Sequence, residues 1–259
     1  MAARRRFRNQ RDRVGMRDLI TSRNMPWSAL KVAATLLCLV FWGIACNADQ
    51  QSGGEAMPAT QTIQLPEPSL SGPVSLEEAL TRRRSVRGFS DHPVTLTEIG
   101  QLLWAAQGVT EHGRGLRTAP SAGATYPLEI IVIVGRAEGL APGAYRYAPG
   151  RHDLIPVLQD DQRQSLARAA LNQSALLQAP VTFAVTAVHA RTEARYGRRA
   201  TRYVDMEAGH AAQNLSLQAV AQGLGSVVIG AFNDRDVSAL LDLPPGESPL
   251  YLIPVGKPR

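Results

Sequence analysis

Hydrophobic residues follow helical spacing or short continuous runs over most of the chain beyond residue 75. One helix is expected from Thr95, which forms a capping box with Glu98, to a glycine stop at Gly108. Its apolar positions recur every three or four residues: Leu96, Ile99, Leu102, Leu103 and Ala106. By contrast, residues 128–134 form a β-branched run bounded by proline and glycine, which predicts a buried strand.

The same patterns place the other elements. Further helices are expected at about 75–84, 161–177, 201–222 and 234–241. Further strands are expected at 144–147, 153–157, 181–188, 226–232 and 249–255, the first two joined as a hairpin. Helices and strands mix without strict alternation, which predicts one α+β domain at 75–259 with a central mixed β-sheet flanked by helices.

The first 46 residues have a different composition, with an arginine-rich stretch followed by an apolar run. The uncharged run beyond Lys31 is 15 residues long, which is short for a membrane-spanning helix but typical of a signal peptide. It ends with the small residue Ala45 before Cys46. This pattern resembles a bacterial lipoprotein signal, in which Cys46 becomes the lipid-bearing first residue. An uncleaved anchor and an ordinary signal peptide are the alternatives.

Residues 47–74 are rich in Gln, Ser, Gly, Pro and Ala and contain few large apolar groups. Such a segment cannot bury enough apolar surface to offset the entropy of ordering, so a flexible tether is predicted. Together with a lipid on Cys46, this tether would hold an exported domain at a membrane, on the extracytoplasmic side.

The net charge of +6 is concentrated at the N-terminus. Residues 1–31 carry nine basic side chains against two acidic ones, whereas the rest of the chain carries 19 against 20. The folded domain is therefore nearly neutral, and a nucleic-acid-binding surface is not expected. The only cysteines, Cys38 and Cys46, lie in the N-terminal segment, which excludes a disulfide framework, a cysteine-based zinc site and a cysteine nucleophile from the domain.

An arginine cluster is conspicuous in this nearly neutral domain. Four arginines and a serine fall within residues 82–87, at the end of the first expected helix. Guanidinium groups bind phosphate in bidentate geometry and a hydroxyl adds a further donor, so the cluster suits a phosphate group. The alternative is a solvent-exposed helix end, where basic side chains complement the helix dipole.

Three other motifs are weaker. The glycines of residues 223–225 follow a helix and precede a strand, the reverse of the order that a dinucleotide-binding loop needs. Ser121 lies in no G-x-S-x-G elbow, which argues against a hydrolase. Glu207 and His210 form a single Glu-x-x-His pair without carboxylate-bearing partner helices, so no metal site is expected.

The long helix expected at 201–222 carries a polar stripe. Its members are spaced by four, three and four residues: Tyr203, Glu207, His210 and Asn214. This stripe faces either solvent or a ligand or partner subunit, and periodicity alone does not decide between the two.

Taken in order, several segments resemble the FMN-dependent nitroreductase superfamily, and most closely its SagB-type branch, which includes the azoline oxidases of peptide-heterocycle maturation. The segments are 83–89, 120–129, 207–215, 223–226 and 229–232. The resemblance covers about residues 74–259 and implies a nitroreductase-like, dimeric FMN-binding fold.

The resemblance also implies roles for individual residues. Contacts to the FMN phosphate and ribityl chain are expected from Arg83, Arg84, Ser85 and Arg87, with Lys257 and Arg259 as further phosphate candidates near the C-terminus. Contacts along the flavin are expected from Ser121, Ala122, Gly123 and Ala124, and backbone amides near the isoalloxazine from Gly230 and Ala231. Tyr203 is the candidate proton donor. The azoline oxidases use a Lys-Tyr pair as catalytic base, where this chain has Arg202 and Tyr203.

The expected function is a homodimeric FMN-dependent oxidoreductase that transfers hydride through the flavin N5 atom to or from a small-molecule or peptide substrate. NAD(P)H is a candidate electron donor. Reduction of nitro or quinone compounds and SagB-type dehydrogenation both remain open. The alternative from another class is a tethered, non-catalytic binding or accessory protein on the same scaffold.

Overall fold

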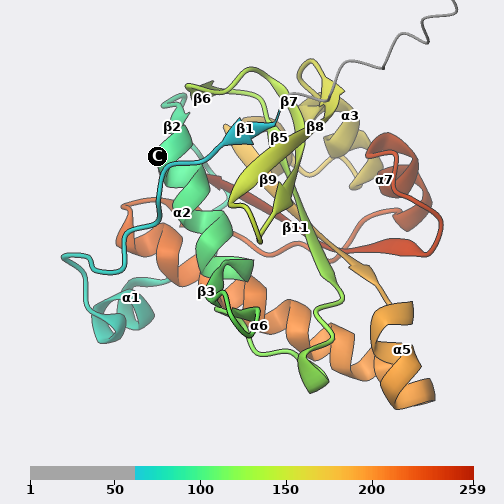
Figure 1. Ribbon diagram of the computed structural model, residues 1–259. Helices are drawn as coiled ribbons and strands as arrows, with labels where there is room; N and C mark the ends of the chain where they lie inside the picture. Colours follow the sequence, from blue (N-terminus) through green and yellow to red (C-terminus); the bar gives the residue numbers. More distant parts are fainter. Residues whose placement is uncertain (1–61) are drawn as a thin grey trace, which may run out of the picture. The chain divides into compact units, whose positions relative to one another are not determined.

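The computed structural model describes residues 62–259. Seven of its strands form one sheet in the order β1-β8-β7-β5-β9-β11-β10 (Figure 1). These strands are β1 Ile63–Gln64, β5 Leu128–Val134, β7 Gly143–Ala148, β8 Asp153–Gln159, β9 Val181–Val188, β10 Gly225–Ser226 and β11 Glu247–Gly256. Every neighbouring pair is antiparallel, so the α+β prediction is confirmed but the expected mixed sheet is wrong. Two short pairs accompany the sheet: β2 Val94–Thr95 with β6 Ala137–Glu138, and β3 Val109–Glu111 with β4 Leu116–Arg117.

Helices cover both faces of this sheet. They are α1 Leu76–Arg82, α2 Leu96–Gln107, α3 Arg163–Ala169, α4 Ser174–Gln178, α5 Ala190–Tyr196, α6 Ala200–Ala221 and α7 Asp234–Leu240, with single 3₁₀ turns η1 Ala122–Ala124 and η2 Gly197–Arg199. Side chains of α2 and α6 share one hydrophobic cluster with one face of the sheet, and those of α3, α4 and α7 share a second cluster with the other face.

Strand β5 lies in the middle of the sheet because its sequence can be buried on both sides. Ile130 and Val132 belong to the first cluster, whereas Ile131 and Ile133 belong to the second. An unbroken apolar run is what a strand covered on both faces requires. The predicted bounds of β5, 128–134, and of β9, 181–188, are confirmed.

Local capping signals define α2. The Thr95 hydroxyl accepts a hydrogen bond from the Glu98 amide at 3.2 Å, and the Glu98 carboxylate accepts one from the Thr95 amide at 2.7 Å. Both halves of the predicted capping box are thus present. Gly108 ends the helix as expected, and a Cβ there would lie 2.2 Å from the Trp104 ring.

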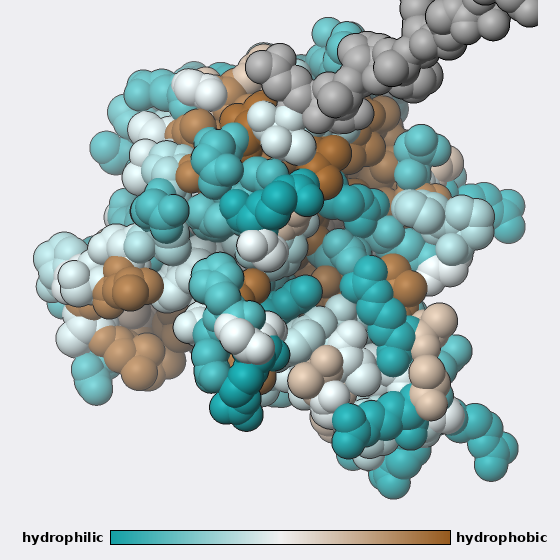
Figure 2. All heavy atoms as spheres, viewed as in Figure 1, coloured by the Kyte–Doolittle hydropathy of each residue, from teal (hydrophilic) through white to brown (hydrophobic). Residues whose placement is uncertain are grey.

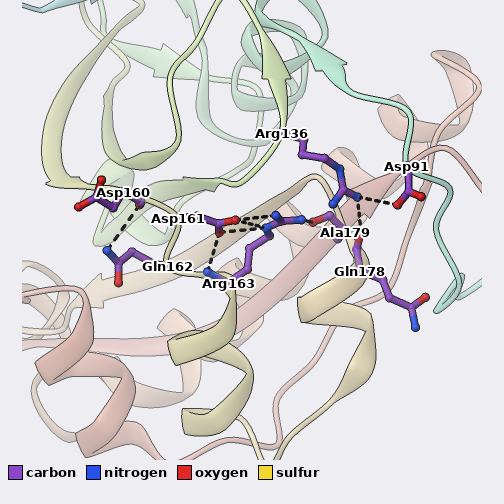
Figure 3. A network of polar contacts seen from close by, with 8 residues as sticks. All are labelled: Asp91, Arg136, Asp160, Asp161, Gln162, Arg163, Gln178 and Ala179. Carbon is purple, nitrogen blue, oxygen red and sulfur yellow. Dashed lines mark hydrogen bonds and ion pairs between the residues drawn. The ribbon is translucent and has the colours of Figure 1, made fainter.

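The helix expected at 161–177 is two helices. Leu171 and Asn172 have φ values of 56° and 58°, which a continuing right-handed helix does not allow, and they separate α3 from α4. Figure 3 shows the start of α3, where Asp161 pairs with Arg163 at 2.5 Å. Arg163 also donates to the Ala179 carbonyl at 3.3 Å, which ties the beginning of α3 to the end of α4.

The strand expected at 226–232 is much shorter. Only Gly225 and Ser226 pair continuously with β11, and Ile229 makes one isolated bridge to Leu252. The residues after Ser226 instead form an irregular edge beside the sheet.

The fold also begins earlier than residue 75. Ile63 and Gln64 pair with β8, and Leu65 is only 2 % exposed. The part of the predicted tether that the structure describes therefore includes a strand and a core residue. Residues 47–61, and the signal segment 1–46 with Cys46, lie outside the described residues and stay predictions.

In the described part of the chain, none of the helices combines the length and the apolar character needed to cross a membrane. Residues 62–259 also hold no group of three or more His, Cys, Asp or Glu side chains arranged for a metal ion.

Candidate functional site

The arginine cluster follows α1 and runs beside the edge of the sheet. Arg82, the last residue of α1, is exposed and pairs with Glu78 at 2.7 Å. The Val86 amide then donates to the Ser226 carbonyl at 2.9 Å, and Ser85 forms a parallel bridge with Ser226. The chain is thus held in an extended form against β10, with Arg84, Ser85 and Arg87 exposed, Arg83 half-buried and Val86 packed against the second hydrophobic cluster.

A glycine makes this close approach possible. A Cβ on Gly225 would lie 2.7 Å from the Cβ of Val86, which real side chains do not tolerate. In the sequence, Gly225 belongs to the rejected dinucleotide motif and to the segment 223–226 of the family resemblance. Its actual role is to let β10 contact the arginine cluster, and the signal for it was a glycine next to a strand.

The C-terminus returns to the same place. The Ser90 amide donates to the Lys257 carbonyl at 2.9 Å, and the Arg259 amide donates to the Gly88 carbonyl at 3.3 Å. Lys257 and Arg259 therefore lie beside the arginine cluster, as a shared phosphate site requires.

Four cationic side chains in this area have no ion pair and no side-chain hydrogen bond within residues 62–259: Arg83, Arg87, Lys257 and Arg259. Arg84 differs, because its guanidinium donates to the Thr81 and Arg83 carbonyls at 2.9 and 2.7 Å and so caps the end of α1. The unpaired cations suit an anion that comes from outside the described chain.

The segment after β10 offers backbone donors further along the same edge of the sheet. Gly230 and Ala231 are exposed, and their amides donate no hydrogen bond within the described residues. The Ala231 carbonyl accepts from the Gln173 side chain at 2.7 Å, which holds the segment in place. Two free N–H groups on a fixed backbone suit the acceptor atoms of a bound ring.

The loop at 121–124 lies elsewhere, against α5. It contains η1, in which Gly123 adopts φ 61°, and the Gly123 carbonyl accepts from Arg195 at 3.1 Å. A Cβ on Gly123 would lie 2.7 Å from the Tyr196 hydroxyl, so glycine allows the tight contact. The Ser121 hydroxyl accepts from the Tyr126 amide at 2.9 Å and stabilises the turn.

Three of the four members of the polar stripe of α6 face neighbouring segments of the chain, and Glu207 faces this loop. Asn214 donates to the Thr118 carbonyl at 3.3 Å, Tyr203 stacks edge-on against Tyr196 with ring centroids 5.0 Å apart, and Glu207 is 3 % exposed. Only His210 points to solvent. The structure makes the stripe a polar seam between segments of one chain, which is neither the solvent-facing stripe nor the ligand- or partner-facing one that the sequence left open.

Glu207 is the unusual member of the seam. Its Oε1 atom is buried and has no hydrogen-bond partner among the described residues. Burial raises the pKa of Glu207, and the nearby Ser121 hydroxyl, Ala122 amide and Arg117 guanidinium only partly oppose this. Arg117 also donates to Gln107 at 2.8 Å. The sequence does not reveal this group beneath the loop, because its residues come from three separate elements, α2, β4 and α6.

Replacing Glu207 with glutamine is expected to remove a pH dependence of stability. Because burial raises its pKa, the folded state holds the proton more tightly than the unfolded state. The resulting stability is complete below the ordinary value of 4.5 and is lost as pH rises through the raised pKa. The variant should melt as the parent does near acid pH and a few degrees higher at about pH 8, since about 1 kcal/mol shifts the Tm of such a domain by about 2–4 °C.

Thermal melts of both proteins at several pH values test this expectation. Glu138→Gln is the matched control, because Glu138 is exposed, and it should leave the pH profile unchanged. A Glu207→Gln variant whose Tm difference from the parent does not grow with pH would contradict the assignment.

The two groups of expected flavin contacts lie at opposite ends of α6. The 121–124 loop is beside Glu207, whereas the arginine cluster is at β10, beyond Ala221. Glu207 and Ala221 are 14 positions apart, which at 1.5 Å per residue places them about 21 Å apart along the helix. Figure 1 shows the same arrangement, with α1 and α5 at opposite ends of α6. One chain therefore brings together the arginine cluster, the C-terminus and β10, but not the 121–124 loop.

Comparison with known proteins agrees with this fold. Residues 80–257 match the profile of the Nitroreductase family. A protein of Methanocaldococcus jannaschii that is named for its likeness to nitroreductases is 45 % identical over 201 residues, which cover 78 % of this chain and 98 % of that protein.

Two solved structures are also similar. One, from Ralstonia eutropha and likewise named for nitroreductases, has a TM-score of 0.69 at 30 % identity and covers 79 % of this chain and 93 % of its own. A chain of the Escherichia coli microcin synthetase complex has a TM-score of 0.60 at 23 % identity, over 74 % and 77 % of the two chains, which shows a common fold alone. With more than half of its length matched by the profile and a relative this similar, the chain belongs to the nitroreductase family of oxidoreductases.

Proposed function

We propose that this protein is an FMN-dependent oxidoreductase that works as a homodimer. The observation that carries the proposal is the convergence of unpaired cations from Arg83, Arg87, Lys257 and Arg259 beside β10, with a free backbone segment at residues 230–231 further along the same edge of the sheet. Cations without partners fit the FMN phosphate, and free N–H groups fit the acceptor atoms of the ring, so this donor set suits the cofactor that members of the family generally bind.

Once bound, the flavin would supply the hydride chemistry at its N5 atom, with NAD(P)H as the electron donor. The chain's own residues hold the phosphate, orient the ring and place N–H donors at its polar edge. Such donors raise the reduction potential of the ring. Tyr203 is the proposed proton donor, because it is partly buried in the seam that follows the 121–124 loop.

The homodimer follows from the division of the site. Because the 121–124 loop lies far along α6 from the arginine cluster of its own chain, we propose that a second copy supplies that loop to the same flavin. The surface offers an interface: Leu70, Leu76 and Leu80 are 83 %, 61 % and 51 % exposed. Figure 2 shows hydrophobic side chains gathered over α1. A groove of about 360 Å³ beside them is lined by α1, Trp104 and Leu217.

The substrate is proposed to be a small molecule. A peptide substrate and SagB-type dehydrogenation remain part of the proposal, because the protein shares its fold with a chain of the microcin synthetase complex. Arg202 stands beside Tyr203 where the azoline oxidases have lysine, and a guanidinium does not give up its proton. Reduction of nitro or quinone compounds is therefore the favoured direction. We also propose that Cys46 carries a lipid that anchors the exported protein.

The absorption spectrum of the purified chain tests the function. A flavin spectrum at about one FMN per chain is expected, with bleaching by NADH or NADPH under anaerobic conditions and recovery on adding a quinone. A colourless protein that gains no thermal stability from added FMN would overturn the proposal. Bound flavin that no donor reduces would favour the non-catalytic, tethered binding protein instead.

A further inference from the structure

Most arginines of the described chain have a structural partner. Figure 3 shows two of them: Arg136 contacts Asp91 at 3.6 Å and donates to the Gln178 carbonyl at 2.8 Å, and Arg163 is held by Asp161. Within residues 62–259, the arginines with neither an ion pair nor a side-chain hydrogen bond are Arg83, Arg87, Arg198, Arg199, Arg202, Arg235 and Arg259.

These unpaired arginines form two groups and one isolated residue. Arg83, Arg87 and Arg259 belong to the proposed FMN phosphate site. Arg198, Arg199 and Arg202 form a second group, and Arg235 on α7 stands alone. Arginines without a partner are therefore clustered at one further place in the described chain, residues 198–202.

The second group lies on η2 and the first turn of α6, and all three side chains are exposed. Glu193 and Asp205 are the nearest acidic residues in sequence, but neither forms an ion pair with the group. Three guanidinium groups within five positions repel one another. Their combined potential is lowered by an anion, and guanidinium forks bind phosphate or carboxylate in bidentate geometry.

The group is next to the 121–124 loop. Arg195 and Tyr196, the last residues of α5, contact Gly123, and η2 with its arginines follows at once. Tyr196 also packs against Tyr203 of α6, so the turn between α5 and α6 is held against the loop. The second arginine group thus lies beside the part of the chain assigned to the ring, and at the opposite end of α6 from the phosphate site.

We propose that Arg198, Arg199 and Arg202 form a second anion site, which receives a phosphate or carboxylate group of the molecule that exchanges electrons with the flavin. The inference rests on the proposed function, because it takes the 121–124 loop as the ring side of the site. It gives the substrate a chemical class: an anionic donor such as NADPH, or an acceptor that carries an acid group.

Equilibrium binding tests the site without turnover. The full chain is titrated calorimetrically with 2′,5′-ADP, which carries two phosphate groups, and with adenosine as the neutral control. The triple variant Arg198→Gln, Arg199→Gln, Arg202→Gln is expected to bind 2′,5′-ADP roughly tenfold more weakly, the combined effect of three exposed charge pairs. Arg235→Gln is the matched control, because it removes an equally unpaired arginine from another place.

Two half-reactions then identify the source of the anion. In the first, the flavin is reduced by NADPH or NADH; in the second, dithionite-reduced protein is reoxidised by 4-nitrobenzoate or by neutral 4-nitrobenzamide. A selective loss for NADPH in the triple variant assigns the site to the donor, and a selective loss for 4-nitrobenzoate assigns it to the acceptor. Both losses should shrink as salt screens the charges.

The anion site is overturned if the triple variant binds 2′,5′-ADP as tightly as the parent, or if Arg235→Gln weakens binding equally. Failure of the proposed function looks different, because the parent protein itself would then contain no flavin. The triple variant is expected to retain FMN, since none of its three substitutions touches the arginine cluster at 83–87.

Discussion

The double variant Arg83→Ala, Ser85→Ala is expected to lose FMN while keeping its fold. Arg83 has no partner within the described chain and Ser85 is exposed, so the two side chains contribute little to the core. Charge-assisted hydrogen bonds contribute about 1.5–3 kcal/mol each, so losing both contacts weakens FMN binding by about 3 kcal/mol or more, roughly 100-fold. The ratio of flavin to protein absorbance after purification measures the loss, and a thermal melt without FMN checks the fold.

Arg82→Ala is the control that separates a specific site from general basic charge. Arg82 belongs to the same run but pairs with Glu78 on the surface of α1, so its removal should leave FMN bound. Stoichiometric FMN in the double variant would contradict the phosphate site and support the alternative, in which the cluster is a solvent-exposed helix end. Equal losses in both variants would show that net charge, rather than a shaped site, attracts the cofactor.

Elements with strong local signals could be predicted from the sequence nearly to the residue. The start of α2 follows from a capping box that needs only Thr95 and Glu98, and β5 and β9 follow from short runs rich in β-branched residues, as a strand covered on both faces requires. In each case the determining interactions lie within the element or at its own ends.

The errors concern positions decided by distant contacts or by unusual backbone angles. A helical pattern runs through 161–177, but Leu171 adopts a left-handed backbone conformation, which a leucine does not predict. Residues 63–65 look like tether by composition, and their pairing with β8 depends on an edge that the sequence does not locate. The strand expected at 226–232 fails because only its first residue finds continuous pairing with β11.

The residues of the expected site were likewise predicted only in part. Lys257 and Arg259 come to the arginine cluster through strand-like pairing with residues 88–90, which supports their grouping in one site. The order of motifs along the chain does not reveal that the 121–124 loop is placed at the other end of α6. A resemblance to a family indicates which residues contact one ligand. Only the fold shows which of these residues lie close together within a single chain.

This separation leads to the prediction with the most distinctive outcome, a complementation between two defective chains. One chain carries Arg83→Ala and Ser85→Ala. The other carries Gly123→Val, which forces a side chain into a position where φ is 61° and the Tyr196 hydroxyl is 2.7 Å away, and so shifts the loop. Each homodimer should lack FMN, because both of its sites contain a defective half. A heterodimer of the two chains should hold about one FMN, because one site then combines the two intact halves.

The matched control places all three substitutions in one chain and pairs it with an unaltered chain. Both heterodimers contain the same substitutions, so they differ only in how the substitutions are distributed, and general destabilisation affects them alike. If the two halves of a site come from different chains, this second heterodimer has a defective half in each site and should hold no FMN. If one chain builds a whole site, the outcome reverses: the first heterodimer is empty and the second holds about one FMN through its unaltered chain. Differently tagged chains purified in two steps, followed by flavin absorbance per dimer, distinguish the two arrangements.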